Sequence, residues 1–150
     1  MCQTAVNPPE FQYILENYKE ICYNVENAKA KYGGRDVRVM AVTKTVPPEK
    51  VNYAVSLGID LLGENRVQEY LSKKDSYFSS AQVHMIGHLQ TNKVKYIIND
   101  VDMIQSVDSL KLASEINRLA EKNNKTMDVL IEVNIGGEES KSGVHADGLY

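Results

Sequence analysis

The chain has 150 residues, of which 43% are hydrophobic and 25% are charged, and its formal net charge is −3. This composition predicts one globular domain with a hydrophobic core, and the slight acidity argues against a nucleic-acid partner. No apolar stretch approaches the roughly 20 residues that span a bilayer, and the first 20 residues lack the pattern of a secretory signal, so no membrane partner is expected.

The first predicted element is an amphipathic helix. Apolar residues recur at helical spacing from Phe11 to Val25, which indicates one buried helix face. The preceding Asn7-Pro8-Pro9-Glu10 segment predicts an N-cap at Asn7, and Gly33-Gly34 predicts the C-terminal end.

Cysteine usage favours a cytoplasmic protein. The chain contains only Cys2 and Cys22, and no C-x-x-C motif accompanies them. Neither a zinc site nor a redox pair is therefore expected. Cys22 falls on the apolar face of the first helix, so it is predicted to be one buried thiol that packs as a small hydrophobe.

Five short apolar runs then alternate with helical segments. Strands are predicted at 37–43, 59–62, 83–86, 103–107 and 127–135. Helices are predicted at 48–57, 65–74 and 91–98, and a further helix after Asp108 has its apolar face within 112–120. Gly58 is expected to end the first of these helices, and Asn65 and Asp108 are expected to cap later ones. The run 37–43 is apolar at nearly every position, which is typical of a strand covered on both faces. This alternation predicts a parallel sheet, either in a doubly wound fold or in part of a (β/α)₈ barrel.

Candidate functional residues follow the strands, because binding groups in both folds gather at the carboxyl ends of parallel strands. For any one of these polar residues, other than Lys44, a role in turns or helix capping is the favoured explanation. Lys44 differs, because it shares strand parity with Met40 and Val42 and should leave one apolar face at the end of its strand. Partial desolvation there would favour a neutral amine that can form a Schiff base with an aldehyde. The alternative is a lysine that simply reaches solvent.

Other motifs argue against several kinds of site. His84 and His88 are four residues apart but lie on a strand and its exit loop, without an H-E-x-x-H motif, so no metal site is predicted. The segment 136–143 lacks the residue order of a phosphate-binding loop, and no G-x-G-x-x-G follows the first strand. No catalytic acid–base pair accompanies Lys44, so no catalytic residue is assigned.

Five stretches at the strand ends together carry a specific resemblance. They are VMAVTKT at 39–45, GENRVQE at 63–69, HMIGHLQTNK at 84–93, QSVD at 105–108 and EVNIGGEESKSG at 132–143. In this order and spacing they resemble the pyridoxal phosphate homeostasis family of the YggS/PROSC type. That family is related in fold to the N-terminal barrel of alanine racemase.

The resemblance implies a (β/α)₈ barrel of the TIM type that holds pyridoxal 5′-phosphate (PLP) as a Schiff base on Lys44. It implies that the cofactor is lined by residues at later strand ends, namely Asn65, His88, Ser106 and Asn134. Lys141 matches a further family lysine. The implied function is vitamin B6 homeostasis by a monomeric cofactor carrier without enzymatic activity, with PLP-dependent apoenzymes as partners.

The family barrel needs eight strands, whereas this chain provides about five. We therefore expect residues 1–150 to form a single partial PLP-binding barrel domain that is truncated at its C-terminus. The outer edge of the fifth strand should then be unpaired, which favours association. Two alternatives stay open, a catalytic PLP enzyme of the alanine racemase or decarboxylase barrel type and a non-catalytic interaction module.

Overall fold

The computed structural model describes residues 8–34 and 36–148. The strands are β1 (Ala41–Val42), β2 (Leu61–Glu64), β3 (Gln82–Met85), β4 (Met103–Val107) and β5 (Asp128–Ile131). The α-helices are α1 (Gln12–Tyr32), α2 (Pro48–Ser56), α3 (Val67–Lys73) and α4 (Leu110–Lys122). Short 3₁₀ helices cover Pro9–Phe11, Lys74–Ser76, Thr91–Tyr96 and Ala146–Gly148.

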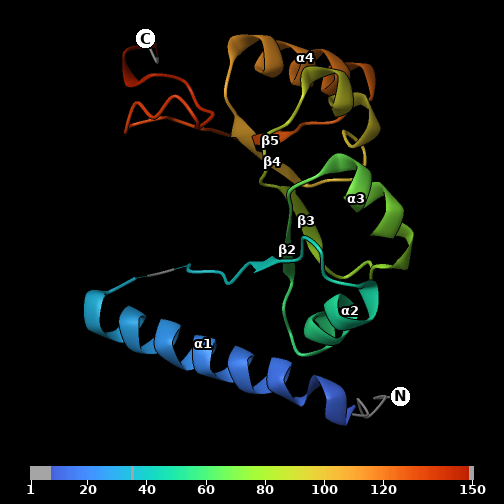
Figure 1. Cartoon of the computed structure of the whole chain (residues 1–150), viewed down its shortest axis with the longest axis vertical. Coiled ribbons are helices and arrows are strands. Elements are labelled where there is room, and N and C mark those ends of the chain that lie inside the picture. The colour runs from blue at the N-terminus through green and yellow to red at the C-terminus, as the bar shows by residue number, and fades with distance from the viewer. Residues whose placement is uncertain (1–7, 35, 149–150) are drawn as a thin grey trace.

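The sheet has the strand order of a barrel. Its five strands are parallel and lie in the order β1-β2-β3-β4-β5, so each strand pairs with the next one along the chain. Helices α2, α3 and α4 lie on one side of the strands (Figure 1). A doubly wound sheet reverses its strand order and carries helices on both faces. Of the two folds that the sequence left open, the structure therefore has the arrangement of consecutive barrel units.

The hydrophobic core lies between the sheet and these helices. Leu62, Met85 and Ile104, on three central strands, are each completely buried. Burial on both faces was predicted for the run 37–43, and this prediction is wrong, because Val37 and Val42 are each about half exposed. All four residues of β2 are buried, whereas all four residues of β5 are exposed. The difference arises because β2 has a paired strand on each side and β5 is the last strand of the sheet.

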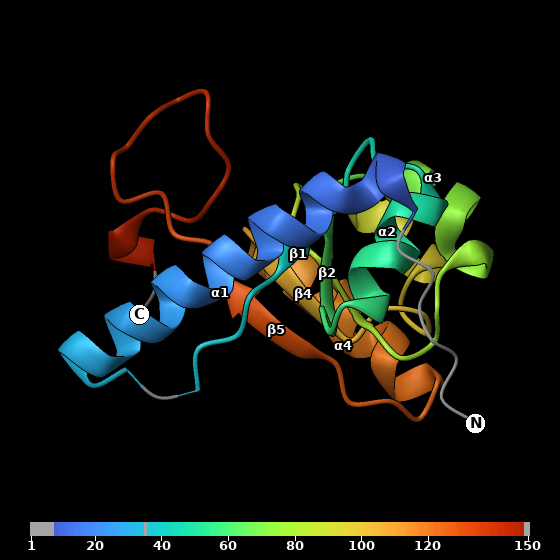
Figure 2. The same cartoon turned by 90° about the horizontal axis from the view of Figure 1, so that it is seen from below.

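Helix α1 confirms the predicted helix and its end at Gly33, which adopts a left-handed φ of 73°. The predicted cap Asn7 lies outside the described residues. The helix passes beside β1 at the margin of the sheet (Figure 2) and packs on the core through Ile14 and Tyr18. No residue of α1 is fully buried, and Cys22 is half-buried rather than the buried thiol predicted. The cause is that only one side of α1 contacts the rest of the chain.

Two predicted helix caps are wrong. Arg66 rather than Asn65 precedes α3, without a side-chain hydrogen bond. Ser109 rather than Asp108 caps α4, and its hydroxyl accepts a hydrogen bond from the backbone of Leu112. At α4 the serine next to Asp108 is the residue whose side chain reaches the helix, whereas α3 begins without a side-chain cap.

Three predicted elements also have different bounds or types. The predicted helix at 91–98 is a 3₁₀ helix, and the first and last strands are shorter than expected. β1 is short because its ladder begins only where Ala41 meets Leu62. After β5 the chain turns, and Val133 forms an isolated bridge with Val144. In the described ranges, β5 itself pairs only with β4.

No helix among these residues has both the length and the apolar character needed to cross a membrane.

Candidate functional site

The carboxyl ends of β1, β2 and β3 meet closely. The ladders pair Val42 with Gly63 and Glu64 with Met85, so the residues after these strands adjoin one another. Gly87, after β3, approaches the backbone of Asn65, after β2. A Cβ atom at Gly87 would lie 2.4 Å from the Asn65 carbonyl oxygen. The predicted junction residues therefore form one tightly packed rim.

Lys44 lies at this rim in a four-residue turn, residues 43–46, which we call the Lys44 turn. The turn is closed by a hydrogen bond of 3.1 Å from the Val46 amide to the Thr43 carbonyl. Its third residue, Thr45, has a φ of +61°, a conformation that glycine or asparagine normally adopts in turns. Such a conformation in a β-branched residue costs about 1–3 kcal/mol and persists only where surrounding contacts enforce it.

The Lys44 side chain is exposed, and no hydrogen bond or ion pair engages its amine among the described residues. The partial desolvation expected at this position is therefore not found. The physical reason is that β1 ends at Val42 and Lys44 lies in the following turn, where the alternation of the strand no longer sets the direction of its side chain. The amine therefore makes no bond to other described residues, and the turn that carries it has a defined geometry.

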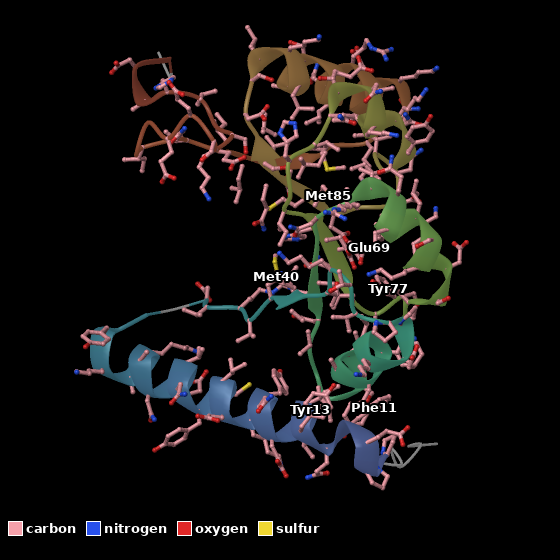
Figure 3. The ribbon with its side chains drawn as sticks, viewed as in Figure 1. Phe11, Tyr13, Met40, Glu69, Tyr77 and Met85 are labelled. Carbon is pink, nitrogen blue, oxygen red and sulfur yellow. The ribbon has the colours of Figure 1, made fainter. Side chains whose placement is uncertain are left out.

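A buried ionic cluster lies directly beneath the Lys44 turn. Its members are Thr43, Glu64, Glu69, Lys73 and Tyr77. The fully buried Glu64 accepts hydrogen bonds through Oε1 from the Thr43 hydroxyl at 2.8 Å and the Tyr77 hydroxyl at 2.6 Å. The Lys73 ammonium lies 3.3 Å from the same oxygen. Glu69 and Tyr77 lie on the α3 side of the strands, whereas Met40 lies on the opposite side (Figure 3).

Lys73 connects this cluster to the turn. Its Nζ donates to the Thr43 carbonyl at 3.1 Å, the Val46 carbonyl at 3.4 Å and Glu69 Oε1 at 2.7 Å. Burial by itself would lower the pKa of Lys73, but contacts with Glu69, Glu64 and Tyr77 outweigh it and raise that pKa. Burial, then the hydrogen bond to Glu64, raises the pKa of Tyr77 to about 12. Lys73 is therefore a cation and Tyr77 a neutral donor at neutral pH.

The ion pair between Glu69 and Lys73 predicts a stability that depends on pH. The hydrogen bond from Lys73, and then that from the Thr45 amide, hold the pKa of Glu69 below its ordinary 4.5. Such a carboxylate stabilises the fold above its unfolded pKa and loses that contribution as the pH falls through the folded pKa. Glu69→Gln is expected to lower the free energy of unfolding by about 1–3 kcal/mol near neutral pH.

Urea unfolding of both chains at a series of pH values checks this expectation. The difference between them should shrink as the pH falls from about 4.5 through the lower folded pKa of Glu69, because the unfolded carboxylate is protonated first and the native one only below its own pKa. A difference that stayed constant well below that pH would contradict the assignment of this charge.

The structure brings three of the other predicted residues to the same rim. Asn65 Oδ1 is buried and has no hydrogen-bond partner among the described residues. The exposed ring of His88 places Nδ1 2.9 Å from Asp108 Oδ2. Ser106 is buried, and its hydroxyl donates to the Gly87 carbonyl at 2.7 Å, so it braces the rim from the core side. A role for these three side chains in lining a cofactor stays a prediction.

Asn134 and Lys141 belong to the loop that follows β5. The Asn134 amide donates to the Glu138 carbonyl at 2.9 Å and accepts from the Glu138 amide at 3.3 Å. It also lies 3.4 Å from the Lys141 carbonyl, and the Lys141 side chain is exposed. Asn134 therefore organises its own loop, and its predicted contact with a cofactor stays a prediction.

Sequence reasoning missed the buried ionic cluster, although part of its pattern is visible in the sequence. Glu69 and Lys73 are four residues apart, the spacing at which opposite charges meet on a helix. A second missed pair faces the other side of the sheet, where Gln105 Nε2 donates to His84 Nδ1 at 2.8 Å. Burial lowers the pKa of His84, which favours the neutral ring that accepts this bond.

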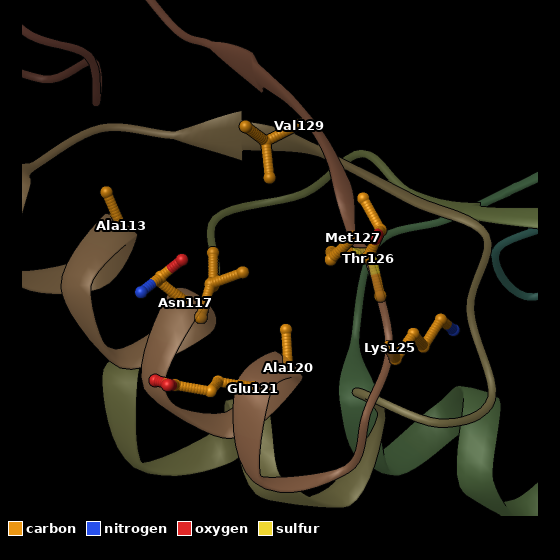
Figure 4. Close-up of a pocket in the computed structure, with 9 residues that line it drawn as sticks. Ala113, Asn117, Ala120, Glu121, Lys125, Thr126, Met127 and Val129 are labelled. Carbon is orange, nitrogen blue, oxygen red and sulfur yellow. The ribbon is translucent and has the colours of Figure 1, made fainter.

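The structure also contains grooves away from the rim. One, of about 590 Å³, lies between α4 and β5 (Figure 4) and is lined by Ala113, Ile116, Asn117, Ala120, Glu121, Lys125, Thr126, Met127 and Val129. None of the predicted site residues lines it. Within 8–34 and 36–148, no group of three or more histidine, cysteine or acidic residues could hold a metal ion.

Several known proteins are similar to this chain in sequence and fold. The family described as alanine racemase, N-terminal domain, matches residues 17–149. A pyridoxal phosphate homeostasis protein of Aquifex aeolicus is 43% identical over 137 residues, which cover 91% of this chain. A solved structure of a Bifidobacterium adolescentis protein covers 93% of the chain at 32% identity and a TM-score of 0.83, and matches over 62% of its own length.

A further solved structure carries the cofactor. PipY of Synechococcus elongatus with PLP bound covers 78% of this chain at 26% identity and a TM-score of 0.62. The match spans 55% of PipY and 58% of the Aquifex protein. The chain thus corresponds to somewhat more than half the length of these relatives.

Proposed function

Because the chain belongs to the alanine racemase N-terminal domain family, we propose that it binds PLP through Lys44 and acts as a cofactor carrier in vitamin B6 homeostasis. The observation that carries the proposal is the free Lys44 amine at the end of β1, on a turn of defined geometry. A relative with PLP bound and a relative named for PLP homeostasis support the choice of cofactor.

The residues at the rim fit this cofactor. An aldehyde requires a primary amine that is not already committed, and Lys44 provides one. Lys73, the other lysine close to the turn, is unsuitable because it is buried, charged and hydrogen-bonded to two carbonyls and a carboxylate. The unpartnered Asn65 Oδ1 is a buried acceptor that a ligand donor would satisfy.

The chemistry of the bound group is a condensation. Lys44 would hold PLP through its aldehyde carbon with loss of one water, so that a carbon–nitrogen double bond would replace the carbon–oxygen one. Asn65 and His88 would orient the ring from neighbouring strand ends. We further propose that release to a competing amine lets the chain supply PLP-dependent apoenzymes in the cytoplasm, where the free thiol of Cys22 would persist.

The test is whether PLP becomes attached to Lys44. Adding PLP to the chain should produce a visible absorption band, and borohydride reduction followed by peptide mass analysis should place the added mass on Lys44. Lys44→Ala is expected to lose the band. The exposed Lys111, on α4, provides a matched control, since Lys111→Ala should keep it. A normal band in Lys44→Ala, or a label on Lys73, would overturn the proposal.

A catalytic function is the second candidate, and the His88–Asp108 pair favours it. A histidine held by a carboxylate at 2.9 Å can accept or donate a proton near a bound substrate. Racemisation and decarboxylation assays on amino acids separate the two functions. Turnover that disappears in His88→Asn would favour the enzyme, whereas PLP binding without turnover favours the carrier.

A further inference from the structure

We propose that Lys73 is a positioning residue that, with Glu64 and Glu69, holds the Lys44 turn in the conformation that presents Lys44 to an aldehyde. This inference rests on the proposed function and names the residues that prepare the same site. It concerns α3 and the outer side of the sheet, so none of these side chains needs to touch the cofactor.

The first step of the argument is that the cluster contacts the turn on both sides of Lys44. Lys73 Nζ donates to the carbonyl of Thr43, immediately before Lys44, and to that of Val46, two residues after it. Glu69 Oε1 accepts a hydrogen bond from the Thr45 amide between them. The backbone that carries Lys44 is therefore fixed at three points, while the Lys44 side chain itself is left free.

The second step is that the turn needs such contacts. Thr45 is β-branched and has a φ of +61°, so the isolated turn would relax away from this conformation. The Glu69 carboxylate and the Lys73 ammonium hold the Thr45 amide and the flanking carbonyls at the same time. Because these bonds involve charged groups, they are stronger than bonds between neutral groups.

The third step is that the cluster is buried and its members are bonded to one another. Glu64 is fully buried and Lys73 is nearly so. The hydroxyls of Thr43 and Tyr77 both donate to Glu64 Oε1, which fixes the carboxylate against which Lys73 rests. Removal of one charged member would leave the others buried without compensation, so the contacts are lost together rather than one at a time.

The experiment compares Lys73→Met with Lys74→Met. Lys74 is the next residue, and its ammonium pairs with Asp100 at 2.7 Å instead of reaching the turn. Capture of PLP by Lys44 is followed by absorbance and by peptide mass after borohydride reduction. We expect Lys73→Met to slow capture by roughly tenfold or more, because the amine is no longer held in place. Lys74→Met should react at the original rate.

A second readout does not depend on PLP. Hydrogen–deuterium exchange of the amides of Thr45 and Val46 should be roughly tenfold faster in Lys73→Met, while exchange in β3 and β4 stays unchanged. If Lys73→Met does not fold, Glu69→Gln provides the same test, since it removes the charge that holds Lys73 and lies at a half-buried position. Added to Lys73→Met, the substitution Thr45→Gly is expected to restore part of the exchange protection, because glycine adopts a positive φ without strain.

The outcomes separate the two proposals. If the unsubstituted chain never labels Lys44, the proposed function fails and the exchange measurement alone decides whether the cluster holds the turn. If the unsubstituted chain labels Lys44, equal capture rates in Lys73→Met and Lys74→Met overturn the positioning role. Equal exchange of Thr45 and Val46 in all variants overturns it as well. Slower capture together with faster local exchange supports it.

Discussion

Replacing Gly87 with alanine is expected to destabilise the chain by about 3 kcal/mol. The added Cβ would lie 2.4 Å from the carbonyl oxygen of Asn65 and 2.8 Å from its Cα, and both are backbone atoms. A side chain could rotate away from such a clash, but the end of β2 cannot move without breaking its ladder to β3. Alanine would otherwise stabilise by about 0.4–1 kcal/mol, because it restricts the unfolded chain, and the clash exceeds that gain.

Two other glycines provide the controls. At Gly34 the nearest atoms to a new Cβ lie 3.7 Å away, so Gly34→Ala should leave stability unchanged or raise it. At Gly63 the new Cβ would meet the side-chain ends of Met40 and Ile86 at 2.8 and 2.9 Å, which can shift. Urea unfolding should therefore rank Gly87→Ala as the most destabilised, then Gly63→Ala, then Gly34→Ala. Equal midpoints for Gly87→Ala and Gly34→Ala would show that the rim is not closely packed.

Gly87→Ala should also impair PLP binding. The substitution pushes Asn65 away from the end of β3, and Asn65 is the rim residue with an unpartnered buried acceptor. Binding measured at a temperature where the variant remains folded should be weaker, whereas Gly34→Ala should bind as the original chain does. Unchanged binding in a folded Gly87→Ala variant would remove Asn65 from the candidate site.

Truncating Ile104 to alanine is expected to cost about 2–5 kcal/mol in the free energy of unfolding. Ile104 is completely buried on β4, where it belongs to the core between the sheet and its helices. The loss combines the hydrophobic burial energy of the removed atoms with the energetic cost of the cavity that they leave. Thermal or urea unfolding, with circular dichroism to confirm the native fold, measures it.

Leu130 is the matched site on the exposed strand. It is also an aliphatic residue on a parallel strand, but its side chain is 49% exposed. Leu130→Ala should therefore cost less than about 1 kcal/mol. Similar losses at Ile104 and Leu130 would mean that β5 is covered in solution, for example by a second copy, and the mass of the chain would then rise with concentration.

The sequence carried enough information for the order and type of most elements. Alternation of apolar runs with helical periodicity places five strands in succession, and all five form parallel ladders. Gly33 and Gly58 end helices as expected, because positive φ values of 73° and 107° favour glycine. The caps were less predictable, since Ser109 caps α4 in place of the adjacent Asp108, and α3 begins after Arg66 without a side-chain cap.

The family match over 17–149 confirms the fold class that the resemblance implied, whereas PLP attachment at Lys44 stays a prediction. Sequence parity alone suggested that Lys44 would be partly desolvated, and this was wrong. Desolvation of a side chain depends on which other residues pack over it in the folded chain. The half-exposed Val42 shows that few residues pack over this end of β1.

By itself, then, the sequence determined a series of βα units, their chain order and the lysine at the end of the first strand. These features follow from periodicity and from short motifs, which are local along the chain. The tertiary structure alone decided that the strands lie in barrel order and that Gly87 abuts Asn65. It also decided that Glu64, Glu69 and Lys73 meet beneath the Lys44 turn. Those contacts join residues up to about 30 positions apart, and their energies arise from burial and charge that exist only once the chain has folded.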